Sequence, residues 1–329
     1  GKSTLFNALT RAGAAVAGYP FTTIDPNVGV VPLADPRLDE VARIIRPEQV
    51  LPTTVRFVDI AGLVQGAHRG EGLGNQFLGH IRGVDAVAMV VRCFESSEVP
   101  HVTEVLDPVR DIDVIDTELL LADLAVLERR LERTRSAAKG HPREYAAELA
   151  WLEELGRQLA AGVPARGFAR TEAEAQWERE LDLLTAKPRM FVANIGEEAC
   201  PHGGPLAAAV MERAAREGAP AVVLCSQVEM TLQEWPAEEA SEYLLQLGMS
   251  EPGLQLVART GYALLDLITF FTTAGEKMVQ AWTVHRGATA PEAAGEVHSD
   301  MQRGFIRAEV VRYDDLVRLG SMAAVREHG

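Results

Sequence analysis

Four short apolar stretches constrain the fold of this chain more than any other feature. They are rich in Val, Ala, Met and Phe, and helix-length segments separate several of them. Short buried strands that alternate with helices are typical of an α/β domain whose sheet is mainly parallel. We therefore expect an α/β fold with strands at "TVRFVDI" (54–60), "DAVAMVVRCF" (85–94), "RMFVANI" (189–195) and "APAVVLCS" (219–226).

Between the second and third of these strands, two leucine seams predict an antiparallel helical hairpin. Leucines recur at helical spacing in a strongly charged segment, Gly140 and Pro142 then break the helix, and a second leucine series follows. Six basic residues lie near the expected tip, from Arg129 to Arg143. They form either the solvated face of a coiled coil or a docking surface for RNA or a ribosome. The seams consist of Leu120, Leu124, Leu127 and Leu131, and of Leu149, Leu152, Leu155 and Leu159.

The composition changes again after residue 250. The stretch "GLQLVARTGYALLDLITFF" (253–271) predicts a helix that begins after Pro252. Segments 276–298 and 304–316 predict the strands and turns of a small α+β module. Because the chain has no initiator Met and stops at Gly329 without an obvious final strand, we expect truncation at both ends.

Composition and charge exclude several classes of function. A net charge of -15 with a pI near 5.0 argues against nucleic-acid binding by the whole surface, although a local basic patch is compatible with it. We expect no sequence-specific DNA binding. Cys93, Cys200 and Cys225 form no Cys-x-x-Cys pair and are expected to be buried free thiols. No apolar run approaches the ~20 residues of a membrane helix, so we expect a cytoplasmic protein without a membrane partner.

The opening stretch "GKSTLFNALT" combines the end of a phosphate-binding loop with a helical pattern. Backbone N–H groups at the start of such a helix face the phosphates of a nucleotide. Lys2 is then expected to reach the β- and γ-phosphates, and the Ser3 hydroxyl is expected to ligate magnesium. The tripeptide alone is weak evidence, but further motifs follow it in the chain order of a G domain.

The two switch segments of a G domain have candidates in the sequence. In "FVDIAGL", Asp59 ends a strand and Gly62 follows in an Asp-x-x-Gly arrangement. Asp59 is expected to hold magnesium through water, and the Gly62 N–H to approach a γ-phosphate. Upstream, Thr22 and Thr23 lie in a polar loop where a first switch is expected, and such a Thr coordinates magnesium only when the γ-phosphate orders the loop.

The residue that positions the attacking water is altered. Leu63 stands where Ras-type enzymes carry a Gln, and leucine can neither donate nor accept a hydrogen bond. His68, in the Gly-rich segment that follows, is a candidate to orient water or to offset phosphate charge. The alternative is a solvent-facing loop histidine. We expect slow hydrolysis unless a partner or a monovalent cation such as K⁺ completes the site.

The tetrapeptide "NIGE" stands where a GTPase carries Asn-Lys-x-Asp. Asn194 can bond to either purine, Ile195 offers an apolar contact, and Glu197 places its carboxylate one methylene beyond the position that guanine needs. Adenine is therefore tolerated. Ser226 and Gln227 close the fourth strand, where a G domain has its second base-contacting loop.

With these residues together, the chain resembles the Obg-like ATPases of the YchF family. Matching stretches include "YPFTTIDPNVGVVPLADPRLD", "VDIAGLVQGAHRGEGLGNQFL", "VANIGEE" and "AGEKMVQAWTVHRGATAPEAAGEVHSDMQRGFIRAEVVRYDDL", and together they span nearly the whole chain. The resemblance implies a P-loop G domain of OBG type over 1–252 with an inserted coiled-coil arm at about 117–185. A helical linker over 253–269 and a ubiquitin-like TGS domain over 270–329 complete the implied organisation.

The resemblance also implies a magnesium-dependent ATPase switch that prefers ATP to GTP. It implies association with the ribosome, on the large subunit, through the arm and the TGS domain. The implied contacts are phosphate binding by Gly1, Lys2, Ser3 and Thr4, magnesium binding by Ser3 and Thr23, and adenine binding by Ile195. An Obg-type GTPase and a nucleotide-gated ribosome adaptor with incidental hydrolysis are the alternatives.

Overall fold

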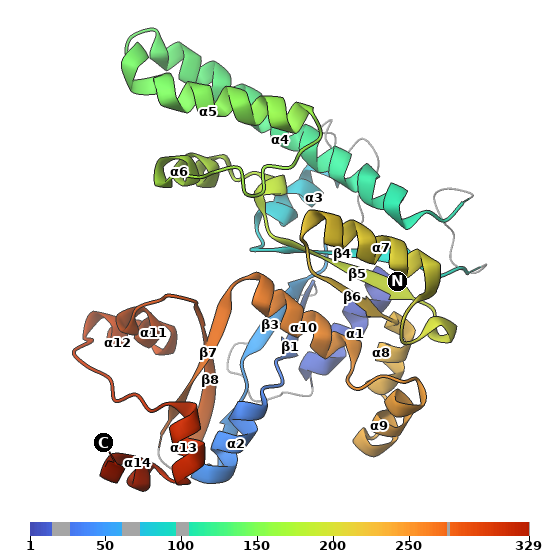
Figure 1. The fold of residues 1–329 in the computed structure, drawn as a ribbon, viewed down its shortest axis with the longest axis vertical. Helices are drawn as coiled ribbons and strands as arrows, with labels where there is room; N and C mark the ends of the chain where they lie inside the picture. Colours follow the sequence, from blue (N-terminus) through green and yellow to red (C-terminus); the bar gives the residue numbers. More distant parts are fainter. Residues whose placement is uncertain (15–26, 61–72, 97–104, 275–276, 329) are drawn as a thin grey trace. The chain divides into compact units, whose positions relative to one another are not determined.

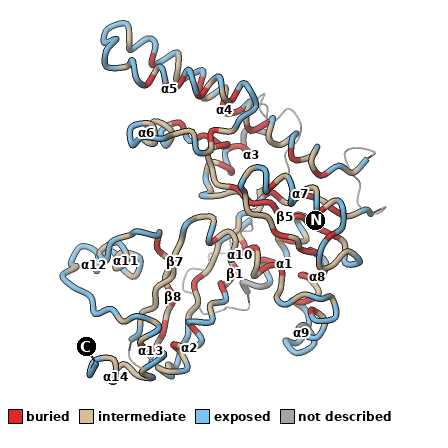
Figure 2. Tube along the Cα trace, in the orientation of Figure 1, coloured by how far each residue is buried: buried red, intermediate tan, exposed pale blue. Residues whose placement is uncertain are grey.

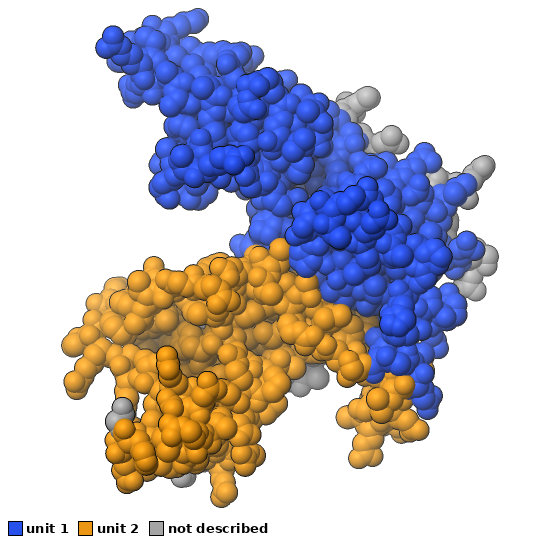
Figure 3. All heavy atoms as spheres, viewed as in Figure 1, with its two compact units in different colours: residues 1–3, 58–228, 246–249 blue, residues 4–57, 229–245, 250–329 orange. Residues whose placement is uncertain are grey.

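The structure, a computed structural model, describes residues 1–14, 27–60, 73–96, 105–274 and 277–328. Five positions singled out in the sequence lie outside these ranges: Thr22, Thr23, Gly62, Leu63 and His68. The chain divides into two compact units (Figure 3). Unit 1 consists of residues 1–3, 58–228 and 246–249, and unit 2 consists of residues 4–57, 229–245 and 250–329.

A parallel three-stranded sheet forms the centre of unit 1. Its strands, in spatial order, are β4 (Val87–Cys93), β5 (Arg189–Ile195) and β6 (Ala221–Leu224), which confirms three of the four predicted strands. Every residue of β5 is buried (Figure 2), as expected for the middle strand of a parallel sheet that is covered on both faces. The register pairs Asn194 with Leu224, so the loops that follow β5 and β6 leave the same edge of the sheet.

The two leucine seams form the predicted hairpin. Helix α4 (Pro108–Ala138) and helix α5 (Pro142–Ala160) lie side by side (Figure 1), and the chain turns between them where Gly140 and Pro142 were expected to break it. Both helices start with a proline, and α4 has Asp107 as its N-cap. The core of the hairpin contains Leu127, Trp151, Leu152, Leu155 and Leu159, with Leu120, Leu124 and Leu131 packed against it. Leu149 is only half-buried and lies outside this core, so its assignment to the seam was wrong.

The buried carboxylate of Asp123 ties the hairpin to the sheet domain of unit 1. Helix α6 (Glu172–Leu181) and the short 3₁₀ helix η2 (Leu184–Ala186) return the chain from the hairpin to β5. Asp123 accepts hydrogen bonds from the Leu184 N–H at 2.8 Å, the Thr185 N–H at 2.8 Å and the Thr185 hydroxyl at 2.7 Å. Burial raises the pKa of this carboxyl, although the three hydrogen bonds oppose the shift.

Further helices complete unit 1. Helix α7 packs on β5, and α3 contributes Leu78 and Ile81 to a core that also contains Leu119, Ala122 and Leu184. Helices α1 and α8 begin in this unit and continue into residues assigned to unit 2. The bounds are α1 (Lys2–Ala14), α3 (Leu73–Arg82), η3 (Glu197–Ala199), α7 (Gly204–Glu217) and α8 (Ser226–Leu232).

The predicted strand at 54–60 belongs to a different sheet. Strand β3 (Thr54–Val58) is hydrogen-bonded to β1 (Val28–Pro32) in a two-stranded sheet, and not to the strands of unit 1. Within the described residues, the parallel sheet therefore contains three of the four predicted strands. The sequence did not predict β1, because "VGVVP" is a run of only five residues between turn-forming segments.

A second sheet in unit 2 joins segments from distant parts of the chain. Strands β7 (Leu267–Thr273) and β8 (Met278–His285) form an antiparallel pair, and β2 (Gln49–Leu51) adds to β8 in parallel. Helix α10 (Gly253–Leu264) ends before β7, so the predicted helix over 253–271 and the helical linker to 269 were too long. The physical reason is local: Asp266 has a φ of 50°, which stops the helix, and "LITFFTT" is rich in β-branched and aromatic residues.

The final segment is more helical than predicted. Residues 290–297 form a helix because Thr289 and Glu292 make a capping box. Residues 304–312 form no strand. Within the described residues, the three-stranded sheet of unit 2 has β2 and β7 as its edge strands. The prediction of strands over 304–316 was therefore wrong. The remaining helices of unit 2 are α2 (Pro36–Ile45), α9 (Ala237–Gln246), α11 (Ala290–Val297), α12 (Ser299–Arg303), α13 (Tyr313–Leu319) and α14 (Met322–His328).

Helices α2 and α13 cover one face of the β7–β8 pair. Their buried contacts come from Leu38, Val41 and Leu316, which pack against Val279 and Ala281. No helix in the described part of the chain is both long enough and apolar enough to cross a membrane.

Replacing Asp123 by Ala is expected to lower the free energy of unfolding by about 3 kcal/mol, because three buried donors lose their acceptor. Asp123→Asn keeps one acceptor oxygen and should fall between the Ala variant and the wild type. The matched control is Glu128→Ala on the exposed side of α4, for which we expect a change within about 0.5 kcal/mol. Urea denaturation followed by circular dichroism measures all three, and equal losses for Asp123→Ala and the control would contradict this role.

Candidate functional site

The start of α1 and the end of β3 meet through Lys2. Its ammonium forms an ion pair with the Asp59 carboxylate and donates a hydrogen bond to the Ile60 carbonyl at 2.7 Å. These residues lie 57 and 58 positions away in the sequence. The fold therefore brings Lys2, in the predicted phosphate-binding segment, next to Asp59 and Ile60, with which the predicted Asp-x-x-Gly arrangement begins.

The oxygen atoms around Lys2 suit a hard cation. Ser3 is exposed at the first turn of α1, Thr4 beside it is half-buried, and the Asp59 side chain is 22% exposed. Among the residues that the structure describes, no three His, Cys, Asp or Glu side chains gather into a metal cluster. Mg²⁺ needs none, because it is held by one or two protein oxygens together with substrate phosphates and water. The hydroxyl of Ser3 and the carboxylate of Asp59 therefore fit the predicted ion.

The buried side chain of Asn194 lies where three segments meet: the end of β5, the start of α8 and the residue before α1. Its side-chain oxygen accepts hydrogen bonds from the Ser226 N–H at 3.0 Å and the Ser226 hydroxyl at 2.6 Å. A Cβ on Gly1 would lie 3.4 Å from Nδ2 of Asn194, so the phosphate loop passes over the other end of the same amide. Since a carbonyl oxygen has two lone pairs, both acceptor positions of Asn194 are used within the protein. Only its NH₂ group can serve a purine.

The other residues of the "NIGE" loop differ in exposure. Ile195 is 3% exposed, and its Cγ2 lies 2.7 Å from where a Cβ on Gly203 would be, so its side chain faces the interior. Glu197 is exposed at the start of η3, and Gln227 is exposed in the first turn of α8. The exposed side chains among the predicted base contacts are therefore those of Glu197 and Gln227, whereas the side chain of Ile195 is buried.

Gly196 makes room for a carboxylate that the motif analysis did not include. A Cβ at position 196 would lie 2.6 Å from Cδ of Glu198 and closer still to its Oε1. The Glu198 side chain thus folds back onto the main chain of Gly196, and any larger residue there would displace it. The only sequence signal was the second acidic residue in "GEE".

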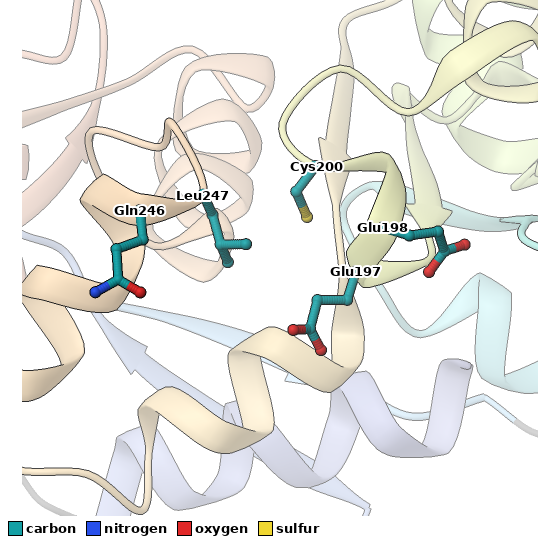
Figure 4. Close-up of a pocket in the computed structure, with 5 residues that line it drawn as sticks. All are labelled: Glu197, Glu198, Cys200, Gln246 and Leu247. Carbon is teal, nitrogen blue, oxygen red and sulfur yellow. The ribbon is translucent and has the colours of Figure 1, made fainter.

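A hollow of about 550 Å³ lies beside the same loop. Glu197, Glu198 and Cys200 line it from the loop after β5, and Gln246 and Leu247 line it from the end of α9 and the segment that follows (Figure 4). Burial, helped by the nearby Cys225 and Glu197, raises the pKa of the Cys200 thiol to about 12.

The three cysteines are free, as expected. Cys93 and Cys225 are buried, whereas Cys200 is only half-buried, which corrects the prediction for that residue. Burial also raises the pKa of the Cys93 thiol to about 12, so this thiol and that of Cys200 are protonated at neutral pH.

Glu229 is a fully buried acidic residue that the sequence analysis missed. It lies one turn after Ser226 in α8, and its carboxylate accepts hydrogen bonds from the N–H groups of Gly253 and Leu254. The available signal was Ser-x-x-Glu, a spacing typical of a capping box. Here the carboxylate caps a different helix, α10.

Comparison with known proteins places this arrangement in a family. Residues 1–132 match the family model described as a 50S ribosome-binding GTPase, and residues 267–329 match the C-terminal domain model of the YchF GTPases, described as a protein of unknown function. The protein named ribosome-binding ATPase YchF of Haemophilus influenzae is 50% identical over 329 residues, which is 100% of this chain and 90% of the relative. This chain belongs to the YchF family.

Other YchF proteins extend the similarity to a second bacterium and to a solved structure. The ribosome-binding ATPase YchF of Bacillus subtilis is 46% identical over 331 residues, again with 100% of this chain and 90% of the relative covered. The solved YchF GTPase of Schizosaccharomyces pombe is 34% identical, with a TM-score of 0.89 over 100% of this chain and 89% of that chain. These matches confirm the predicted fold class: a P-loop G domain with a mainly parallel sheet, followed by the C-terminal domain of YchF proteins.

Ser226→Ala tests the junction at Asn194. The change leaves one lone pair of the buried Asn194 oxygen without a donor, so we expect nucleotide affinity to fall about fivefold to tenfold. Competition against a fluorescent ATP analogue measures the dissociation constant. Ser241→Ala is the control, because the Ser241 hydroxyl also donates a hydrogen bond but lies exposed on α9, away from the loop. An unchanged dissociation constant in a folded Ser226→Ala protein would show that the junction does not position the site.

Proposed function

We propose that this chain is a magnesium-dependent, ATP-binding and ATP-hydrolysing switch that associates with the ribosome. The observation that carries the proposal is the ion pair between Lys2 and Asp59 at the start of α1, where Gly1 lies next to Asn194. Relatives that are named ribosome-binding ATPases, and a matched family model described as 50S ribosome-binding, support the choice of nucleotide and of the large subunit. A cytoplasmic location follows from that partner.

The phosphate end of the site works through charge. The backbone N–H groups at the start of α1 and the Lys2 ammonium hold the phosphates of the nucleotide. Ser3 and Thr23 would hold Mg²⁺ directly and Asp59 would hold it through water, and the ion would offset the charge on the β- and γ-phosphates. The ion pair keeps the Lys2 ammonium beside the Asp59 carboxylate, at the start of α1 where the phosphates are proposed to bind.

The switch itself is assigned to residues around the γ-phosphate. Thr23 and the Gly62 N–H respond to that phosphate, and His68 positions the attacking water in place of the glutamine replaced by Leu63. Without a hydrogen-bonding group at position 63, hydrolysis is slow until a ribosome or a monovalent cation such as K⁺ completes the site. Hydrolysis rates with and without ribosomes separate this switch from an adaptor, because an unstimulated rate near background favours the adaptor.

Base choice rests on Glu197 and Gln227, the exposed side chains of the two base loops. The bacterial relatives are named ATPases, whereas the solved relative from Schizosaccharomyces pombe is named a GTPase, so GTP is the second candidate. A carboxylate can accept a hydrogen bond from the 6-amino group of adenine, but it repels the 6-oxygen of guanine. Glu197 is too long for the usual contact with the N1–H and 2-amino group of guanine, so adenine is tolerated, and the names of the bacterial relatives favour ATP.

The hairpin supplies a basic surface for the ribosome. Arg130 and Arg135 are engaged in salt bridges within the arm, Arg130 with Glu148 and Glu180. The other four basic residues of the tip are exposed and form no salt bridge within the described parts of the chain: Arg129, Arg133, Lys139 and Arg143. On a chain of net charge -15, this local patch suits the phosphate backbone of RNA. We assign the arm to about 117–185, between the halves of a G domain over 1–252, and a TGS domain to 270–329.

ATP is expected to displace a fluorescent nucleotide from the protein at lower concentration than GTP, by about tenfold or more. The loop argument predicts that Ile195→Lys combined with Glu197→Asp, which restores Asn-Lys-x-Asp, narrows or reverses this ratio. The single change Glu234→Asp, far from the loop in sequence and exposed, is the control. If the double variant keeps the wild-type ratio, the "NIGE" loop does not select the base.

Replacing Arg133 and Arg143 by Glu is expected to weaken ribosome binding about tenfold at low salt and to reduce its salt dependence. Co-sedimentation with purified large subunits over a range of salt concentrations measures both. Arg179→Glu with Arg216→Glu changes the net charge equally on exposed residues of α6 and α7 and is the matched control. Equal weakening in both double variants would mean that net charge, and not the tip of the arm, governs binding.

A further inference from the structure

Glu229 is a buried carboxylate whose hydrogen-bond partners are backbone groups. The residue is 0% exposed, and its two oxygens accept the Gly253 N–H at 2.7 Å and the Leu254 N–H at 3.2 Å. No charged side chain among the described residues contributes to its ionisation. Burying a carboxylate without a cation costs free energy, so a glutamate is an unfavourable choice if its only role is to satisfy two N–H groups.

Local residues cap other helices of this chain without that cost. Asp35, Asp107 and Thr171 each accept hydrogen bonds from the helix that they immediately precede. Helix α10 is preceded by Pro252, which has no side-chain cap, and its first N–H groups are instead capped from 24 and 25 positions earlier in the sequence. The long-range cap fastens α8 to the start of α10, which a local cap could not do.

The same short helix carries the second base loop. Ser226 begins α8 and donates two hydrogen bonds to Asn194, and Glu229 follows three positions later, one helical turn away. Helix α8 has seven residues and is therefore held at both of these points. Ser226 and the exposed Gln227 thus lie on the same short helix as the anchored Glu229.

We propose that Glu229 is a positioning residue for nucleotide binding: its ionised carboxylate holds α8 so that Ser226 and Gln227 are preorganised for the base. The inference rests on the proposed function, because it requires that the chain binds ATP. Glu229 itself does not touch the nucleotide. It acts through the helix that carries the base loop, and a loosened α8 lowers the fraction of molecules that are ready to bind.

The charge state of Glu229 separates this role from a purely structural one. Burial raises its pKa to about 7, while the two N–H groups oppose the shift. A raised pKa means that this group's contribution to stability is fully present below the ordinary pKa of a glutamate and is lost as the pH rises to about 7. The ionised carboxylate nevertheless accepts on both oxygens, so ionisation strengthens both hydrogen bonds between Glu229 on α8 and the start of α10. As the pH rises, the contribution of Glu229 to stability falls while its contribution to ATP affinity increases, and a merely structural residue would move both in the same direction.

The test compares Glu229→Gln with the wild type at about pH 6 and about pH 8.5. The dissociation constant of MgATP is measured by competition, and the free energy of unfolding by urea denaturation. Glutamine keeps one acceptor oxygen, as protonated Glu229 does. We expect the ratio of the variant's dissociation constant to that of the wild type to be near one at the lower pH and to increase to about threefold to tenfold at the higher pH. The ratio cancels the titration of the terminal phosphate of ATP, which affects both proteins.

Glu234→Gln is the matched control, because Glu234 is exposed and pairs with Arg11 in unit 2. Its ratio should stay near one at both pH values. A flat ratio for Glu229→Gln, with ATP bound normally by the wild type, overturns the positioning role alone. A wild type that binds no ATP overturns the proposed function and this inference with it. If Glu229→Gln does not fold, Glu229→Asp replaces it: the shortened carboxylate should weaken ATP binding at both pH values, and wild-type affinity in that variant overturns the role.

Discussion

The hydrogen bonds of one buried amide hold the candidate site together. Asn194 lies at the end of the fully buried strand β5 and accepts two hydrogen bonds from Ser226 after β6, and its NH₂ group lies next to Gly1, at the end of the predicted phosphate loop. These three segments are far apart in the sequence. A buried amide without its donors costs about 1–3 kcal/mol for each unsatisfied group. Losing the Ser226 donors would therefore leave the Asn194 oxygen unsatisfied where the two predicted base loops meet.

The elements that the sequence predicted well are those with a local signal. The strands of unit 1 are apolar runs, and the hairpin follows leucine spacing and a Gly140 to Pro142 break, so each could be found without knowledge of its partners. The pairing of Gln49–Leu51 with Met278–Gln280 has no such signal, because it joins segments more than half the chain apart. Likewise, nothing in "TVRFVDI" distinguishes a strand that pairs with β4 from one that pairs with β1. Register and partner choice are non-local, and composition does not encode them.

The candidate site divides in the same way. Lys2, Asp59, Asn194 and Ser226 were predictable as a group, because they follow strand ends or start helices in a fixed chain order, and the fold brings them into two contacting sets. Their side-chain directions were not predictable. Successive residues of a strand point to opposite faces, and in a strand that is buried on both faces no alternation of polarity shows which face is which. This is why the sequence did not reveal that the side chain of Ile195, which was expected to offer an apolar contact to adenine, lies in the interior.

With Ile195 turned inward and the Asn194 oxygen already occupied, the discrimination between purines in the proposed site has to come from charge. Gly196 lets the Glu198 carboxylate lie against the main chain beside Glu197, so two acidic groups border the loop. Both purines offer donors to such a border, the 6-amino group of adenine and the N1–H and 2-amino groups of guanine, so the purine that it favours depends on which base edge faces the carboxylates. The absence of a side chain at position 196 thus creates the space in which a second carboxylate stands beside the loop.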